Sequence, residues 1–60
     1  MTSHPLRVLI AEDNADLRDL LVTLVSAEPD LKCVGTAEDV DAVISSTAQQ
    51  IADVLVLDLE

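Results

Sequence analysis

Apolar residues form two near-continuous runs, one near each end of the chain. The runs are Leu6–Ala11, interrupted only by Arg7, and Ala52–Leu57, interrupted only by Asp53, and each is followed by acidic residues. A near-continuous apolar run of this length is typical of a strand buried on both faces of a parallel sheet. Between them, Leu31–Thr36 alternates more weakly between apolar and polar positions, which predicts a strand with a more solvated face.

A helical repeat follows the first run. Its apolar positions recur at i, i+3, i+4, i+7 and i+8, which predicts one apolar stripe on a helix: Leu17, Leu20, Leu21, Leu24 and Val25. Asn14 is a good N-cap for this helix. Pro29 disfavours helical geometry in the residue before it, so the helix is expected to end near Glu28.

A second helix is expected from Asp39, its N-cap, to about Gln50. Its apolar face would carry Val40, Val43, Ile44 and Thr47. The run Ser45-Ser46-Thr47 lowers helix propensity, so this helix should be the softer of the two.

The order of elements is therefore strand, helix, strand, helix, strand. This alternation predicts an α/β fold with parallel strands joined by right-handed crossovers. Repeats, low-complexity tracts and Gly/Ser linkers are absent, so the 60 residues are expected to form one domain at most.

Charge and composition narrow the possible functions. Twelve acidic residues against three basic ones give a formal charge of −9, which repels nucleic acid and anionic membrane surfaces. No apolar run reaches the length of a membrane span, and the N-terminus does not resemble a signal peptide. The single cysteine, Cys33, is interpreted as a small buried residue of the core. A cytoplasmic protein is the default expectation.

The acids that end the two apolar runs are the candidate site. Parallel strands bring their carboxyl ends to one edge of the sheet, where α/β proteins bind ligands, so Glu12, Asp13 and Asp58 are expected to meet there. Three neighbouring carboxylates either share a proton or attract a cation. Oxygen ligands favour a hard ion such as Mg²⁺, and a carboxylate can also attack a phosphoryl group. Spacing alone leaves open the alternative that these acids are helix caps and solvated turn residues.

Three segments together resemble the receiver domains of response regulators in two-component signalling. They are Val8–Asn14, which is followed by an amphipathic helix, Val34–Ala37 and Asp53–Leu59. The resemblance runs from about Leu6 to Glu60, and its two acidic motifs are together specific. It implies a flavodoxin-like three-layer sandwich with strand order 2-1-3, in which residues 1–60 are a partial receiver domain ending just after the phospho-acceptor strand.

The resemblance also implies roles for individual residues. Asp58 matches the residue that accepts a phosphoryl group from a phosphohistidine on a sensor histidine kinase or phosphotransfer protein. Asp13 and Asp58 match the carboxylate ligands of Mg²⁺, Glu12 matches a position that helps to bind the ion, and the backbone carbonyl of Glu60 matches the remaining protein ligand. The expected function is a regulatory phospho-acceptor module rather than an enzyme, with a transcriptional output in the parent protein. Arg18 and Asp19 are candidates for kinase contact.

Family receivers continue beyond the stretch that is matched here. Their later strands supply a Ser/Thr hydroxyl and a lysine to the phosphoryl group; Lys32 is no substitute, because it is expected at the opposite end of the sheet. This chain alone is therefore expected to bind metal but to lack full activity. Its last strand would be an unpaired apolar edge, so the chain alone is expected either to be unfolded or to assemble through Val54–Leu57, for example as a homodimer.

Two other classes of function compete with the signalling module. One is a truncated or engineered half-domain that assembles without any chemistry. The other is a haloacid-dehalogenase-like phosphatase fragment, because Leu57–Glu60 faintly resembles the strand-end Asp-x-Asp of those enzymes. A dinucleotide-binding fold is disfavoured, since the first turn lacks the Gly-x-Gly-x-x-Gly loop.

Overall fold

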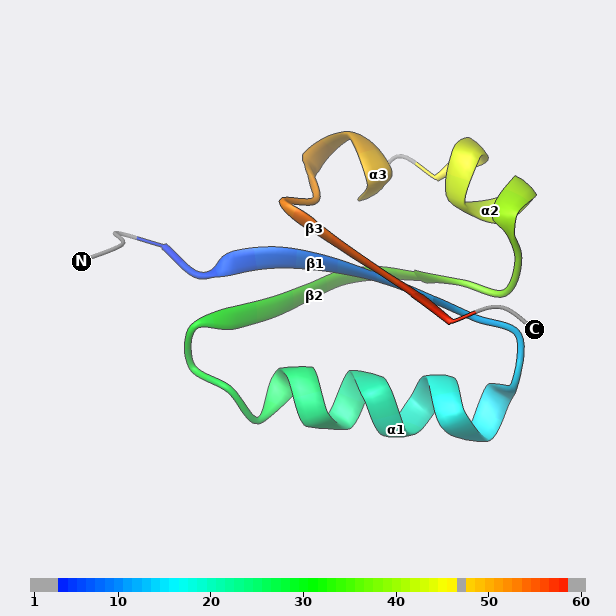
Figure 1. The fold of residues 1–60 in the computed structure, drawn as a ribbon. Coiled ribbons are helices and arrows are strands. Elements are labelled where there is room, and N and C mark those ends of the chain that lie inside the picture. Colours follow the sequence, from blue (N-terminus) through cyan, green and yellow to red (C-terminus); the bar gives the residue numbers. More distant parts are fainter. Residues whose placement is uncertain (1–3, 47, 59–60) are drawn as a thin grey trace.

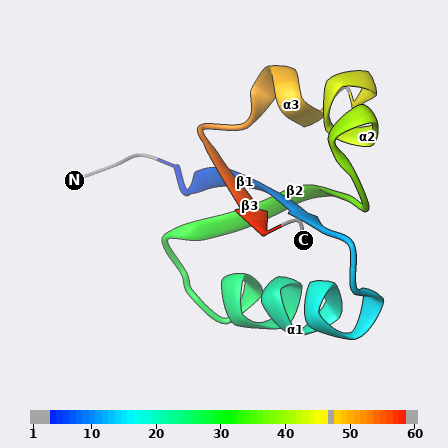
Figure 2. The same cartoon turned by 45° about the vertical axis from the view of Figure 1, so that its right-hand side comes forward.

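The computed structural model describes residues 4–46 and 48–58, which fold into a three-layer α/β unit (Figure 1). Its three parallel strands are β1 (Leu6–Glu12), β2 (Leu31–Ala37) and β3 (Val54–Asp58), and β1 lies between the other two. Helix α1 (Ala15–Ser26) covers one face of the sheet, and α2 (Val40–Ser45) and α3 (Ala48–Ile51) lie over the other (Figures 1 and 2). The predicted flavodoxin-like architecture with strand order 2-1-3 is confirmed.

The core is built around β1, as its apolar run predicts. Val8, Leu9, Ile10 and Ala11 are all buried, because the strand has a neighbour on each side and helices on both faces. Towards α2 and α3 the buried cluster contains Leu9, Ala11, Ala37 and Val43. Among the described residues, no helix is long and apolar enough to cross a membrane.

Two helix predictions need correction. In α1 the half-buried apolar residues are Leu17, Leu21, Val22 and Val25, whereas Leu20 and Leu24 are more than half exposed. The apolar stripe is therefore wider than the surface that the three-stranded sheet offers. The helix ends at Ser26 rather than near Glu28, and its last turn is closed by hydrogen bonds from Ala27 to Thr23 and from Glu28 to Val25, each 3.1 Å.

The predicted second helix is broken into two short ones. Ser46 leaves helical geometry, with a ψ angle of 131°, and its side-chain oxygen accepts a hydrogen bond of 3.1 Å from the Ala48 N–H. A serine that satisfies a local backbone donor competes with helix continuation, which is why the predicted soft point becomes a break. Of the predicted apolar face, Val43 is buried, Val40 and Ile44 are exposed, and Thr47 lies outside the described residues.

Strand β2 contains a bulge next to its only glycine. Val8 pairs with Cys33 but Leu9 pairs with Gly35, so Val34 is the extra residue and the simple alternation expected for this strand is interrupted. At Gly35 an added Cβ would lie 2.8 Å from the Cβ of Ala48, so α3 approaches β2 closely because this residue has no side chain.

Gly35→Ala is therefore expected to destabilise the protein by about 1–3 kcal/mol through overpacking. Urea denaturation of the single variants Gly35→Ala and Ala48→Gly and of the double variant would measure the coupling between the two positions. We expect the double variant to be more stable than the sum of the single effects. Strict additivity would contradict a steric origin.

Asp53 holds the start of β3 against β1. Its Oδ2 accepts hydrogen bonds from the backbone N–H of Arg7 at 2.9 Å and from Arg7 Nε at 3.2 Å, and its own N–H donates to the Arg7 carbonyl at 2.7 Å. These hydrogen bonds lower the pKa of the Asp53 carboxyl below its usual value. The pair sets the register in which Val54 lies beside Val8 and Asp58 beside Glu12.

Asp53→Asn should lower the melting temperature at pH 7, and the loss should shrink as the solution becomes acidic. A carboxyl whose folded pKa is depressed stabilises the fold above its unfolded pKa, and that contribution disappears as the pH falls through the folded pKa. Thermal unfolding between pH 7 and pH 3 would show the two curves converging. Asp19→Asn, an equal charge change on α1, is the control and should leave the melting temperature at pH 7 close to that of the wild type.

The far edge of β3 is open, as predicted. Leu55 and Leu57 are 45% and 57% exposed on this strand, which has a neighbour only on its β1 side within the described residues. Such an edge can pair with another strand. Homodimer formation through it stays a prediction.

Candidate functional site

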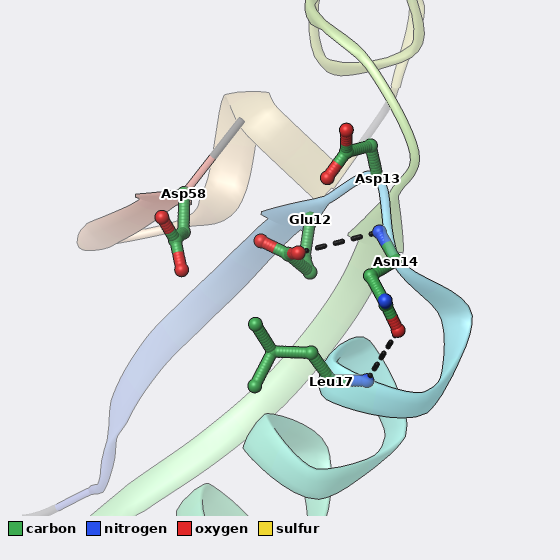
Figure 3. A pocket seen from close by; sticks show the side chains of 5 residues that line it. All are labelled: Glu12, Asp13, Asn14, Leu17 and Asp58. Carbon is green, nitrogen blue, oxygen red and sulfur yellow. Dashed lines mark hydrogen bonds between the residues drawn. The ribbon is translucent and has the colours of Figure 1, made fainter. Parts of the chain in front are cut away.

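The predicted acidic residues meet at one pocket. The pocket lies at the carboxyl ends of β1 and β3, has a volume of about 460 Å³, and is lined by Glu12, Asp13, Asn14, Leu17 and Asp58 (Figure 3). Glu12 and Asp58 are partners in the strand register, so their side chains leave the sheet on the same face. Strand topology alone therefore brings together three carboxylates that are up to 46 residues apart in the sequence.

The first turn of α1 forms the side of the pocket opposite Asp58. The side chain of Asn14 accepts a hydrogen bond of 3.0 Å from the Leu17 N–H, which confirms Asn14 as the N-cap. The Asn14 N–H in turn donates to Glu12 Oε1 at 3.3 Å (Figure 3). The helix start is thus tied directly to the carboxylate at the end of β1.

Glu12 and its two acidic neighbours differ in exposure. Glu12 is only 3% exposed, whereas Asp13 and Asp58 are exposed at the mouth of the pocket. Glu12 Oε2 is buried and has no hydrogen-bond partner among the described residues. An unpartnered buried carboxylate oxygen is costly, because nothing replaces the water that it has lost.

Burial raises the pKa of the Glu12 carboxyl, and the negative charges of Asp58 and Asp13 raise it further, against the opposing effect of the Asn14 N–H. A carboxyl with a raised folded pKa stabilises the fold below its unfolded pKa, and that contribution is lost as the pH rises through the folded pKa. The ionised form of Glu12 therefore opposes folding, and a nearby positive charge would reduce that cost.

These observations fit a hard cation. The pocket holds three carboxylates beside Asn14 and Leu17, and one carboxylate oxygen is buried and unpartnered; oxygen donors of this kind suit Mg²⁺ or a similar ion. Within residues 4–46 and 48–58, however, no three His, Cys, Asp or Glu side chains already lie close enough together to hold a metal. Magnesium binding stays a prediction, and the Glu60 carbonyl that was expected to contribute lies outside the described residues.

Other basic and acidic residues do not join this site. Lys32 lies at the opposite end of the sheet, where it lines a separate pocket with His4, Pro5 and Arg7, as predicted for a residue at the start of a strand. Arg18 is half-buried, and its Nη1 donates to the backbone oxygen of Glu12 at 2.9 Å; kinase contact by Arg18 and Asp19 stays a prediction. Asp19 is exposed on α1.

Sequence reasoning missed the contacts that support the pocket. It found Asn14 only as a helix cap, assigned Leu17 only to the core, and did not foresee the contact between Arg18 and Glu12. No short sequence pattern reveals that contact, because the partner is a backbone carbonyl six residues away across a turn.

Comparison with known proteins finds relatives that share one function. The chain is 38% identical over 60 residues to "protein-glutamate methylesterase/protein-glutamine glutaminase of group 3 operon" of Bradyrhizobium diazoefficiens, covering all of this chain and 16% of the relative. A protein-glutamate methylesterase/protein-glutamine glutaminase 3 of Rhodopseudomonas palustris is also 38% identical over 60 residues, with the same coverage. The corresponding protein of Thermotoga maritima is 33% identical over 60 residues, and the match covers all of this chain and 17% of that protein.

The chain thus spans about one sixth of the length of these curated relatives. No family model matches it, and no solved structure matches it.

Proposed function

We propose that this chain is the N-terminal half of a response-regulator receiver domain and that it receives a phosphoryl group on Asp58 from a sensor histidine kinase or phosphotransfer protein. The observation that carries the proposal is the pocket in which Asp58 lies beside Glu12 and Asp13 at the carboxyl edge of the sheet. Asp58 is exposed there, so a phosphodonor can reach it.

The proposed step is a transfer between a histidine and a carboxylate. One carboxylate oxygen of Asp58 forms a bond to phosphorus, the bond between phosphorus and the imidazole nitrogen breaks, and that nitrogen keeps the electron pair. The product is an acyl phosphate on Asp58 and a free histidine on the donor. Because Asp58 is not regenerated within that step, this chain acts as a regulatory acceptor and not as an enzyme.

Glu12, Asp13 and Asp58 would hold Mg²⁺ with their carboxylates. When bound, the ion supplies positive charge that offsets the charge on the transferring group. The buried, unpartnered oxygen of Glu12 supports this assignment, because a cation would remove its electrostatic cost. The hydrogen bond from the Asn14 N–H to Glu12 Oε1 keeps that carboxylate in the pocket.

We further propose that the output controlled by this receiver is enzymatic. The relatives are named as methylesterases and glutaminases that act on protein glutamate and glutamine, so the expected transcriptional output has no support among them. In the full-length protein, phosphorylation would then change the rate of protein-glutamate methyl ester hydrolysis.

The direct test is to incubate the full-length protein with Mg²⁺ and acetyl phosphate and to locate the acyl phosphate by mass spectrometry. We expect a single modified residue, Asp58. Modification elsewhere, or none, would remove the proposal. Steady hydrolysis of p-nitrophenyl phosphate by this segment would instead favour the phosphatase alternative.

A further inference from the structure

The side chain of Arg18 closes the turn that carries Glu12 and Asp13. Its Nη1 donates to the Glu12 carbonyl oxygen at 2.9 Å, in a partly buried contact, and its backbone N–H donates to the Asn14 carbonyl at 2.8 Å. The Asn14 N–H completes the ring by donating to Glu12 Oε1 at 3.3 Å. Hydrogen bonds therefore fix the residues on both sides of Asp13.

Arg18 carries a positive charge at the acidic end of the sheet without neutralising an acid there. Among the described residues the one ion pair is between Arg7 and Asp53, at the opposite end. The guanidinium of Arg18 is bound instead to a neutral carbonyl. The carboxylate oxygens of the pocket thus stay available to a ligand while the backbone that carries them is held.

The location of Arg18 explains why a long donor side chain is needed. It is the fourth residue of α1 and also lines a second pocket, of about 300 Å³, with Thr36, Ala37 and Glu38 around the end of β2 and Ala42 on α2. From there its side chain spans the gap between α1 and the end of β1. Without it, the Glu12 carbonyl would lose this donor in a partly buried place, and the turn would be free to open.

We infer that Arg18 is a positioning residue: by holding the Glu12 carbonyl it keeps the Glu12–Asp13 turn in the place where both carboxylates line the pocket with Asp58. The inference rests on the proposed function of that pocket and names the residue that maintains its geometry. Arg18 itself is not among the residues that line that pocket.

The experiment compares Arg18→Met, Arg18→Lys and Lys32→Met in the full-length protein. Arg18→Met keeps much of the side-chain length but removes the donors, Arg18→Lys keeps one donor, and Lys32→Met removes an equal charge at the far end of the sheet. The measurements are Mg²⁺ affinity by calorimetry, the rate of Asp58 phosphorylation by acetyl phosphate, and hydrogen exchange of the peptide that contains residues 8–17.

We expect Arg18→Met to weaken Mg²⁺ binding by roughly threefold to tenfold, the equivalent of one lost hydrogen bond, and to speed exchange in the turn. Excess Mg²⁺ should recover most of the phosphorylation rate. Arg18→Lys should lie within about twofold of the wild type, because one donor can still reach a carbonyl. Lys32→Met should match the wild type.

Unchanged Mg²⁺ affinity and unchanged exchange in Arg18→Met would overturn the inference. Equal weakening by Arg18→Met and Lys32→Met would also overturn it, because net charge would then be the cause. If the wild-type protein takes up no phosphate on Asp58, the proposed function fails by itself. Hydrogen exchange in the turn still decides whether Arg18 holds it.

Discussion

Asp58→Asn is expected to reduce phosphoryl incorporation from acetyl phosphate to background. An amide nitrogen or oxygen is a far weaker nucleophile than a carboxylate. Among the described residues, the other carboxylates of the pocket are those of Glu12, which is buried, and Asp13, which follows β1 rather than β3. The fold should survive, since Asp58 is exposed at the last described position of β3.

The control for this result is Asp41→Asn, the same chemical change at an exposed position on α2, away from the pocket. It should incorporate phosphate at the wild-type rate. Asp58→Asn is also expected to weaken Mg²⁺ binding, because one of three carboxylates is lost. Wild-type incorporation by Asp58→Asn would show that the acceptor is another residue.

Leu9→Ala is expected to cause the largest loss of stability of any single change considered for this chain. Leu9 is fully buried in β1 and belongs to the cluster beneath α2 and α3. Truncating a fully buried leucine costs about 2–5 kcal/mol, through lost transfer energy and the cavity that remains. A unit of 60 residues has a total stability of only about 3–9 kcal/mol, so this loss would leave it largely unfolded or close to unfolding.

Urea denaturation followed by circular dichroism would measure this effect, with Leu24→Ala as the matched control. Leu24 is 55% exposed on α1, so the same truncation there should cost less than about 1 kcal/mol. Similar losses at the two positions would mean that another part of the protein covers α1 as completely as the helices cover β1.

The fold was predictable from the sequence because the strongest sequence signals are local and agree with one another. The apolar run of β1, the Asn14 cap and the Asp39 cap all lie where the pattern predicts. Features that depend on packing against neighbouring elements were harder to predict from the sequence. The exposure of Leu20 depends on how far a narrow sheet reaches, and the break at Ser46 depends on a side chain competing for a backbone donor.

The residues of the candidate site could be identified from the sequence pattern. A strand that is buried on both faces tolerates an acid only at its end, where water reaches the charge. Parallel strands place their carboxyl ends together, so Glu12, Asp13 and Asp58 were predictable from pattern and topology.

The tertiary structure alone decided how these acids differ and what holds them. Packing buries Glu12 while leaving Asp58 exposed, and it leaves Glu12 Oε2 without a hydrogen-bond partner among the described residues. It also brings the Arg18 guanidinium to the Glu12 carbonyl. Burial and long side-chain contacts depend on the positions of several elements at once, and a one-dimensional pattern does not contain those positions.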